Sequence, residues 1–217
     1  MTSGTDLAIL TATFNDWQSL KSLLPQIDAV LVEAGHTARL VVVDDGSSSF
    51  VEAELYADLH LRAIRDATVV TLTRNLGNQR ALAVGIAYVA AMVPCEALVI
   101  MDCDHEDRPE YIPVLLNKLR EKTEPRIVFA ARTERSEGRF FRLFYGLYTW
   151  LYRYLTGLPI SIGNFSIIPR RLIPRVAGIS EIWSHFPAGI MRARVPFETI
   201  PSARGQRLYG ESKTNFV

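Results

Sequence analysis

The sequence predicts an α/β fold with a mostly parallel sheet and helices on both faces. Apolar runs of strand length alternate with helical patterns through the first 131 residues, as in chains that cover a parallel sheet on both sides. Three of these runs end in polar clusters. The 217 residues are 48% hydrophobic and 22% charged, which is the composition of an ordinary globular domain with a sizeable core.

The expected elements follow the chain in a regular order. Strands are expected over 7–13, 39–43, 68–72, 97–101 and 127–131, and helices over 17–34, 51–61, 78–91 and 109–122. The last helix has Pro109 at its start, where a missing N–H costs nothing. Since ligands of such sheets bind at the carboxyl ends of the strands, the residues after each strand are the candidates for a site.

The character of the chain changes after residue 131. Residues 139–158 hold 8 of the 21 aromatic residues and form one apolar stripe when placed on a helix, with arginines opposite. Such a stripe fits either core packing or a helix lying at a lipid interface. We expect one domain over 1–217.

Charge is unevenly distributed along the chain. Up to position 125 there are 10 basic and 18 acidic residues, and after it 14 basic and 5 acidic residues. Arginine accounts for 20 of the 24 basic residues, and its planar fork matches phosphate oxygens in pairs. Compositional preference is the plain alternative. If the pattern is functional, the first part suits cations and the second suits anions, and the motifs have to decide between this interpretation and plain composition.

Several classes are excluded or lose support. Two cysteines are too few for a disulfide framework or a thiolate zinc cluster, which favours a reducing, cytosolic setting. The longest uncharged runs, 81–95 and 154–169, are too short for a membrane span and are interrupted by Gly and Pro. Motifs of dinucleotide dehydrogenases, P-loop proteins, zinc proteases and α/β-hydrolases are missing. We expect no nucleic-acid partner, because no such motif is present and the net charge is only +1.

Acidic residues follow the fourth predicted strand. Asp102, Asp104 and Glu106 alternate, so extended backbone would point them the same way. Carboxylate oxygens suit Mg²⁺ or Mn²⁺, although acidic residues before Pro109 could also favour a helix N-terminus. His105 is a candidate neighbour of such a metal.

Two further clusters are suggestive. Asp44 and Asp45 precede Gly46 and could accept from a base or ribose, or could form a turn that caps the next helix. Residues 204–213 pack three cations, a hydroxyl and two glycines, which favours phosphate binding over a solvated tail.

These residues together resemble family 2 glycosyltransferases of the GT-A fold, and among them the polyprenyl-phosphate glycosyltransferases related to dolichol-phosphate mannosyltransferase. The matching segments are TATFND (11–16), VVVDDGSS (41–48), RNLGNQRALAVGI (74–86), VIMDCDHEDRPE (99–110), GNFSIIPRRL (163–172) and RLYGESK (207–213).

The resemblance implies roles for individual residues. It places a nucleotide-sugar and metal half in 1–131 and an acceptor half in 132–217. The implied nucleotide-sugar site comprises Phe14, Asp16, Asp44, Asp45, Asn75, Gly77 and Asp102, and the implied Mg²⁺ or Mn²⁺ site comprises Asp102, Asp104 and Glu106. The implied acceptor phosphate site comprises Arg132, Arg135, Ser136, Arg207, Ser212 and Lys213, and the implied catalytic residues are Asp104, Arg132 and Arg135.

The implied reaction moves a hexose from a UDP- or GDP-sugar to a polyprenyl phosphate with inversion. The sequence departs from the family at Ala12, where proline is usual, and at Asn164, where many relatives carry aspartate. Asn164 cannot serve as a general base, which favours a phosphate acceptor that arrives already ionised. A hydroxyl acceptor on a saccharide, protein or lipid, and a non-catalytic nucleotide-sugar binding module, remain the alternatives.

The resemblance also implies where the protein works. We expect a cytoplasmic protein held peripherally at the inner face of a membrane, with the membrane surface as a partner and a homo-oligomer as a further expectation. Relatives commonly continue into membrane helices, so we expect such a segment to be absent from this chain, which ends at Val217.

Overall fold

The structure is a computed structural model that describes residues 6–48, 59–132 and 162–208. These residues form a seven-stranded sheet in the order β3-β2-β1-β4-β6-β5-β7. The strands are β1 (Asp6–Thr13), β2 (Thr37–Asp44), β3 (Ile64–Thr71), β4 (Ala97–Ile100), β5 (Ile127–Arg132), β6 (Ile162–Pro169) and β7 (Phe197–Ser202). Only β6 runs antiparallel to its neighbours, which confirms the predicted α/β fold with a mostly parallel sheet.

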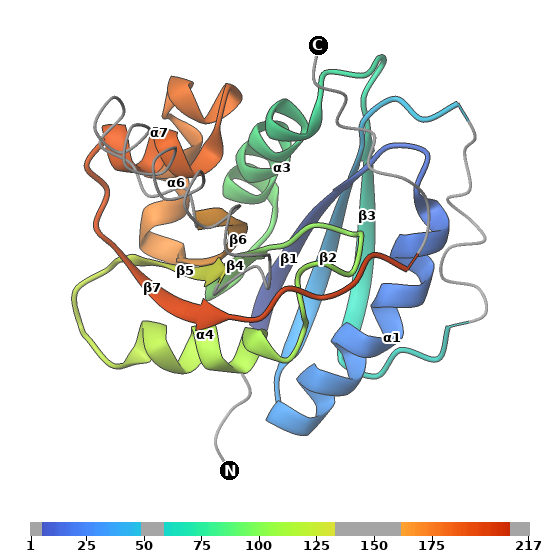
Figure 1. Cartoon of the computed structure of the whole chain (residues 1–217), viewed down its shortest axis with the longest axis horizontal. Helices are drawn as coiled ribbons and strands as arrows, with labels where there is room; N and C mark the ends of the chain where they lie inside the picture. Colours follow the sequence, from blue (N-terminus) through green and yellow to red (C-terminus); the bar gives the residue numbers. More distant parts are fainter. Residues whose placement is uncertain (1–5, 49–58, 133–161, 209–217) are drawn as a thin grey trace, which may run out of the picture.

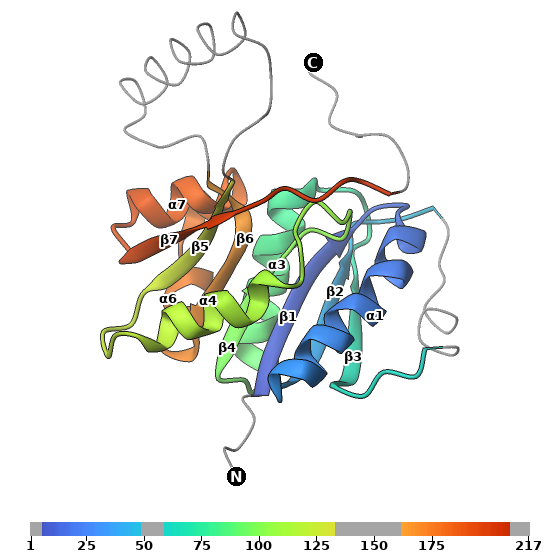
Figure 2. The same cartoon turned by 60° about the horizontal axis from the view of Figure 1, so that its bottom comes forward.

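Helices cover both faces of this sheet (Figures 1 and 2). They are α1 (Trp17–Ala34), α3 (Asn78–Met92), α4 (Tyr111–Arg120), α6 (Ile173–Ala177) and α7 (Phe186–Arg192), with short 3₁₀ helices η1 (Arg170–Leu172) and η2 (Ser180–Trp183). α1 and α4 pack on one face, and α3, α6 and α7 pack on the other. None of these helices is both long enough and apolar enough to cross a bilayer.

The double layer explains the continuous apolar runs of the central strands. In β1, Leu7 and Ile9 point into the cluster under α1 and α4, whereas Ala8 and Leu10 point into the cluster under α3, α6 and α7. All four side chains are fully buried. Because alternate residues of a strand face opposite sides, a strand covered on both faces is apolar over most of its length.

Most predicted elements of the first 131 residues are confirmed, with shifted ends. The helix over 17–34 has its predicted bounds, whereas β3 starts four residues before the predicted strand over 68–72. α4 starts at Tyr111, after a turn at Pro109 and Glu110, so the expectation that Pro109 opens the helix is wrong.

Two predicted helices fall largely outside the described residues. Of the helix expected over 51–61, residues 51–58 are not described, and 59–61 are not helical, so the prediction is wrong at that end. The amphipathic helix expected over 139–158 lies wholly outside the described residues.

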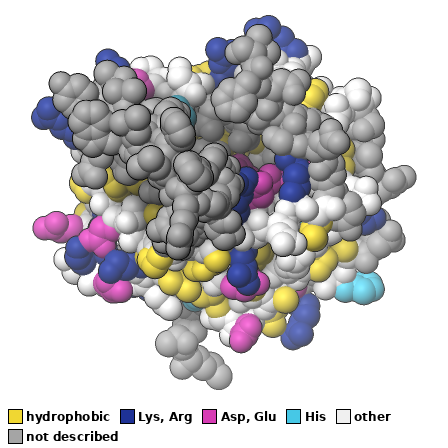
Figure 3. Space-filling view, in the orientation of Figure 1, with side chains coloured by type: hydrophobic (Ala, Val, Ile, Leu, Met, Phe, Trp, Pro, Cys, Tyr) yellow, Lys and Arg dark blue, Asp and Glu magenta, His cyan; other side chains and the backbone are white. Residues whose placement is uncertain are grey.

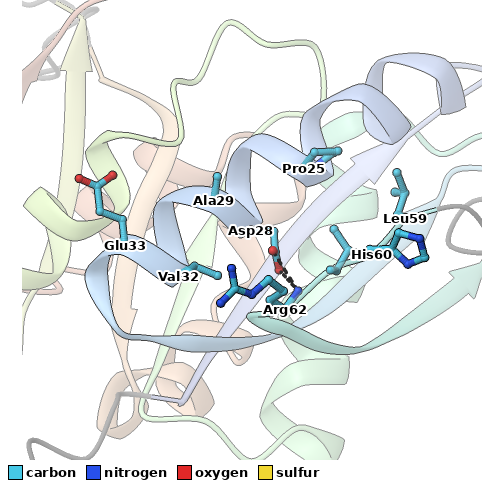
Figure 4. A pocket seen from close by; sticks show the side chains of 9 residues that line it. Pro25, Asp28, Ala29, Val32, Glu33, Leu59, His60 and Arg62 are labelled. Carbon is cyan, nitrogen blue, oxygen red and sulfur yellow. Dashed lines mark hydrogen bonds between the residues drawn. The ribbon is translucent and has the colours of Figure 1, made fainter.

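A buried aspartate holds the chain at the start of β3 against α1. Asp28 on α1 is 6% exposed, and its carboxylate accepts the backbone N–H groups of Arg62, Ala63 and Ile64 at 2.7–3.0 Å. Figure 4 shows the bonds to Arg62. Three donors converge on one carboxylate, which fixes the start of β3 against α1.

The elements after residue 161 are absent from the sequence-based expectations. β6 returns antiparallel between β4 and β5, and β7 is an edge strand that pairs in parallel with β5. β7 carries Pro201 and exposes three of its six residues, both typical of a sheet edge and both weak as a strand signal. Strands from both sides of residue 131 thus share one sheet, and the division into two halves there stays a prediction.

Candidate functional site

A cleft of about 1000 Å³ opens at the carboxyl ends of the parallel strands. Its lining comes from the ends of β1 and β5, from the segments that follow β1, β2, β3, β4 and β7, from the first turn of α3 and from the end of η2. The lining residues are Ala12, Thr13, Phe14, Asp16, Asp45, Asn75, Leu76, Gly77, Asn78, Gln79, Arg80, Asp102, Cys103, Asp104, Glu106, Arg132, Trp183, Ser184, Arg204 and Arg207. Five of them are acidic and four are arginines, so both signs of charge share the cleft.

Residues 102–107, here called the acidic loop, are closed by their own hydrogen bonds. Asp107 is 4% exposed, and its carboxylate accepts the backbone N–H of Asp102 at 2.9 Å. Asp104 accepts the backbone N–H of Glu106 at 3.0 Å. These bonds hold the carboxylates of Asp102 and Asp104 at the cleft wall.

Burial and crowding of negative charge alter ionisation in this loop. Burial raises the pKa of Asp104, and the nearby Asp102 and Glu106 charges raise it further, against a backbone hydrogen bond and Arg207 that lower it. Burial and the Asp102 charge raise the pKa of Asp107 to about 8. Burial raises the pKa of the Cys103 thiol to about 12, so this cysteine stays a neutral thiol. A cation placed among these carboxylates would offset the repulsion between them.

Side-chain amides surround Asp102 from two directions. Asn78 on α3 and Asn164 on β6 each donate to the same carboxylate oxygen of Asp102 at 3.4 Å. Gln79 donates to Asn164 at 3.1 Å and accepts the backbone N–H of Phe186 at 2.6 Å. This amide chain ties the acidic loop to the starts of β6, α3 and α7.

The residues after β2 organise a second wall. The Asp45 carboxylate accepts the backbone N–H groups of Leu76 and Gly77 at 2.7 and 2.9 Å, so it positions the loop before α3. Gly46 has φ +74°, and a Cβ there would lie 2.6 Å from the backbone of Arg74, so only glycine fits this close approach.

Asp44 does not line the cleft. It is 1% exposed, and one carboxylate oxygen accepts the Ser47 N–H at 3.0 Å, which is the turn-forming role that the sequence left open. Its other oxygen is buried without a hydrogen-bond partner. A role for Asp44 in holding the nucleotide stays a prediction.

Arginines from the C-terminal part reach the acidic loop. We call residues 203–208, which follow β7 and run along the edge of the sheet in Figures 1 and 2, the strap. The strap docks through its backbone, because the Gly205 N–H donates to the Glu106 carbonyl at 2.8 Å. Arg207 lies 3.2 Å from Asp16 and 3.7 Å from Asp104, and Arg204 pairs with Glu106.

A third arginine, on the sheet itself, completes this arrangement. Arg132 at the end of β5 lies 3.5 Å from Glu106 and 3.6 Å from Asp107. Figure 3, drawn in the orientation of Figure 1, shows acidic and basic side chains next to one another near the middle of the face in view. The two charge classes that are separated along the sequence therefore meet in space.

The carboxylates at the cleft wall decide how well a divalent metal fits this site. Within 6–48, 59–132 and 162–208, no three His, Cys, Asp or Glu side chains gather closely enough to hold an ion by themselves. Glu106 faces Arg204 and Arg132 instead of completing a trio with Asp102 and Asp104. Asp102 and Asp104 remain a pair of hard oxygen donors at the cleft wall, which suits Mg²⁺ or Mn²⁺ ions that take further oxygens from water and phosphates.

Ten of the residues predicted for the site line the cleft, and the others do not line it or lie outside the described residues. Those that line the cleft are Phe14, Asp16, Asp45, Asn75, Gly77, Asp102, Asp104, Glu106, Arg132 and Arg207. Arg135, Ser136, Ser212 and Lys213 lie outside the described residues.

Sequence reasoning missed several cleft residues. Arg80 and Gln79 lie in a segment that only the family resemblance marks, and Arg204 is one of three cations near the end of the chain with no motif of its own. Trp183 is 45% exposed at the cleft and had no motif to mark it. At Asn164 the sequence shows the departure from aspartate, whereas the contact with Asp102 is visible only in the structure.

Comparison with known proteins identifies the class of protein. Residues 8–175 match the model of glycosyl transferase family 2. The chain belongs to this family, and the prediction of a glycosyltransferase is confirmed at that level.

Two bacterial relatives are named after transfer to a polyprenyl phosphate. The chain is 30% identical over 193 residues to a dodecaprenyl-phosphate galacturonate synthase of Rhizobium johnstonii, covering 85% of this chain and 54% of the relative. It is 25% identical over 222 residues to an undecaprenyl-phosphate 4-deoxy-4-formamido-L-arabinose transferase of Salmonella paratyphi A, covering 97% and 63%. The chain thus spans less than two thirds of the length of these relatives.

A solved structure supports the fold. The mannosyltransferase PcManGT of Pyrobaculum calidifontis, in complex with GDP-Man and Mn²⁺, superposes with a TM-score of 0.62 at 17% identity, covering 97% of this chain and 59% of that one. The predicted GT-A type of fold is confirmed by such neighbours.

Proposed function

We propose that this protein transfers a hexose from a UDP- or GDP-sugar to a polyprenyl phosphate, with the help of Mg²⁺ or Mn²⁺. The observation that carries the proposal is the cleft in which the acidic loop faces three arginines of the C-terminal part. A donor that binds through a metal on carboxylates and an acceptor that binds to arginines could meet in this cleft. The names of the two lipid-phosphate relatives support this choice of acceptor.

The donor would occupy the wall built after β1, β3 and β4. Phe14, Asp16 and Asn75 line it, and the first turn of α3 adds Arg80. A helix N-terminus and a guanidinium both favour the negative charge of a diphosphate. Asp45 would act on the donor indirectly, by fixing the loop that ends at Gly77.

Asp102 and Asp104 would hold the metal. When bound, the ion would offset the charge that grows on the nucleoside diphosphate as it leaves. Arg207 would then exchange its contact with Asp104 at 3.7 Å for a ligand, because an ion on Asp104 competes for the same carboxylate. In such a site, the ion pairs between arginines and carboxylates would be replaced by contacts with the metal and the substrates.

The acceptor phosphate would approach from the arginine side. Arg132 and Arg207 would orient it together with Arg135, Ser136, Ser212 and Lys213. One phosphate oxygen attacks the anomeric carbon while the bond from that carbon to the donor diphosphate breaks, and the diphosphate leaves with the electron pair. No proton has to be removed from an ionised phosphate, so Asn164 needs no base function.

The acceptor also sets the expected location. A polyprenyl phosphate resides in a membrane, so the protein would work peripherally at its inner, cytoplasmic face. Basic residues contribute about 1 kcal/mol each near anionic lipid. The predicted homo-oligomer stays a prediction.

The test is a panel of UDP- and GDP-sugars with Mg²⁺ or Mn²⁺, in which release of nucleoside diphosphate is measured. A short polyprenyl phosphate is compared with the polyprenol of the same length, which lacks only the phosphate. We expect release that depends on the phosphate and stops on chelation. Equal release with the polyprenol would favour a hydroxyl acceptor, and binding of a donor without any release would favour a binding module.

A further inference from the structure

His105 is a buried histidine in the middle of the acidic loop that the proposed chemistry does not use. Its side chain turns away from the cleft and is 6% exposed, whereas the flanking Asp104 and Glu106 line the cleft. Its φ is +67°, in the left-handed region that histidine enters more readily than most non-glycine residues. A residue held in this conformation needs contacts that keep it there.

Those contacts come from α1. The ring Nε2 lies 2.8 Å from the Ser22 hydroxyl and 3.1 Å from the Ser19 carbonyl, and Nδ1 lies 3.4 Å from the Gln26 side-chain nitrogen. A carbonyl only accepts, so Nε2 donates to it, and Nδ1 of the neutral ring is then left to accept from the Gln26 amide. One tautomer therefore serves these three contacts together.

The partners on α1 are themselves tied to the cleft. Ser22 and Gln26 donate within the helix, to the Ser19 and Ser22 carbonyls at 2.9 and 3.3 Å, which fixes both side chains. The Ser19 hydroxyl donates to Asp16, a cleft residue. The first turns of α1 thus connect His105 with a carboxylate that lines the cleft.

The backbone of His105 supports the strap as well. A Cβ at Gly205 would lie 2.0 Å from the His105 carbonyl oxygen, so the strap and the loop are in direct contact at this point. The next residue of the loop, Glu106, accepts the Gly205 N–H. Three segments that are far apart in the sequence therefore meet at one residue.

We propose that His105 is a positioning residue that latches the acidic loop to α1 and thereby sets the geometry of Asp102 and Asp104 toward a divalent cation. The part that concerns the cation rests on the proposed function. Outer contacts of this kind typically change metal affinity 10- to 100-fold when they are removed. The latch itself is a property of the protein without any ligand.

The experiment uses the full chain without donor or acceptor. His105→Asn keeps a residue that tolerates positive φ but is too short to reproduce the ring contacts, and Ser22→Ala removes one contact from the α1 side. His60→Asn is the matched control, since His60 is exposed beside the pocket at α1 and β3 shown in Figure 4. Backbone hydrogen exchange over 101–108 and Mn²⁺ affinity by calorimetry are measured for each variant.

We expect faster exchange confined to the acidic loop and about 10-fold weaker Mn²⁺ binding in His105→Asn, with a smaller change of the same kind in Ser22→Ala and none in His60→Asn. Unchanged exchange over 101–108 would overturn the latch, and so would an equal increase across the whole sheet. Mn²⁺ binding within twofold of the original protein would overturn the effect on the cation. Failure of the unmodified protein to bind Mn²⁺ would contradict the metal proposal and the part of the inference that depends on it, while the exchange data would still decide the latch.

Discussion

The two halves of the strand order, β3-β2-β1-β4 and β6-β5-β7, contribute residues to the cleft in different ways. We call them the parallel side and the mixed side. β3, β2, β1 and β4 are all parallel, so the loop after each strand reaches the same edge. On the other side, β6 runs antiparallel between β4 and β5, and its beginning is the part that reaches this edge. Asn164 comes from the start of a strand, whereas Asp45, Asp102 and Arg132 lie at or just beyond strand ends.

This difference separates two kinds of contribution. The parallel side supplies an acidic loop and the loop before α3, whose positions follow from strand order alone. The mixed side supplies an amide next to Asp102, Arg132, and the strap that leaves β7. Under the proposed function, the parallel side would hold the cation and the donor, and the mixed side would bring the groups that meet the anionic acceptor.

The largest effect is expected on the parallel side. Asp104→Asn removes a charge from the cleft wall without changing shape, and we expect turnover to fall at least about 100-fold with little loss of stability, because the raised pKa of Asp104 shows that its charge is costly to bury. Asp66→Asn, an exposed residue on β3 paired with Arg39, is the control. Full activity of the Asp104 variant after chelation would remove the metal from the mechanism.

The mixed side is tested next at Asn164. Asn164→Asp places a carboxylate 3.4 Å from Asp102 and on the side where the anionic acceptor should approach. We expect the KM for polyprenyl phosphate to rise about tenfold, which corresponds to about 1.4 kcal/mol, with a smaller change for the donor.

Asn78→Asp makes the same change from the α3 side of Asp102. We expect it to affect the donor KM more than the acceptor KM. If the two variants gave the same pattern, the distinction between the two sides would be lost.

A moderate effect is expected where the two sides touch. Gly205→Ala puts a methyl group against the His105 carbonyl, so the strap must move, and we expect a loss of about 1–3 kcal/mol of stability together with lower activity. Gly178→Ala has its nearest neighbour at 3.6 Å and should change neither. Thermal unfolding and initial rates provide the measurements, and an unaffected Gly205 variant would show that the strap does not rest on the loop.

The smallest effect concerns α7 on the mixed side. His185 caps this helix by accepting the Ala188 N–H, and burial lowers its pKa below the usual 6.5. The unfolded chain therefore binds the proton more readily, and the contribution of His185 to stability is present above pH 6.5 and is lost as the pH falls through the lowered pKa.

His185→Asn keeps a capping acceptor but does not titrate, so we expect the drop in Tm below pH 6.5 to shrink by about 1–2 °C. His60→Asn serves as the control. An identical pH profile for the His185 variant would argue against this assignment.

The sequence predicts those elements whose hydrophobic pattern alone is sufficient to identify them. Strands covered on both faces are apolar over most of their length, so the sequence indicates β1, β2 and β4. Asp45, Asp102 and Asp104 lie at the cleft because parallel strands end at one edge of the sheet. β6 and β7 stayed hidden, since their pairing partners are distant in sequence and β7 exposes half of its residues.

The sequence by itself determined the fold class, the acidic character of the loop after β4 and the arginine content of the second part. Only the tertiary structure decided that Glu106 faces arginines, that Asp45 holds a loop, and that His105 reaches α1. The physical reason is that residue type and spacing fix what a side chain can bond to, whereas the choice among partners depends on distances between segments that only folding brings together.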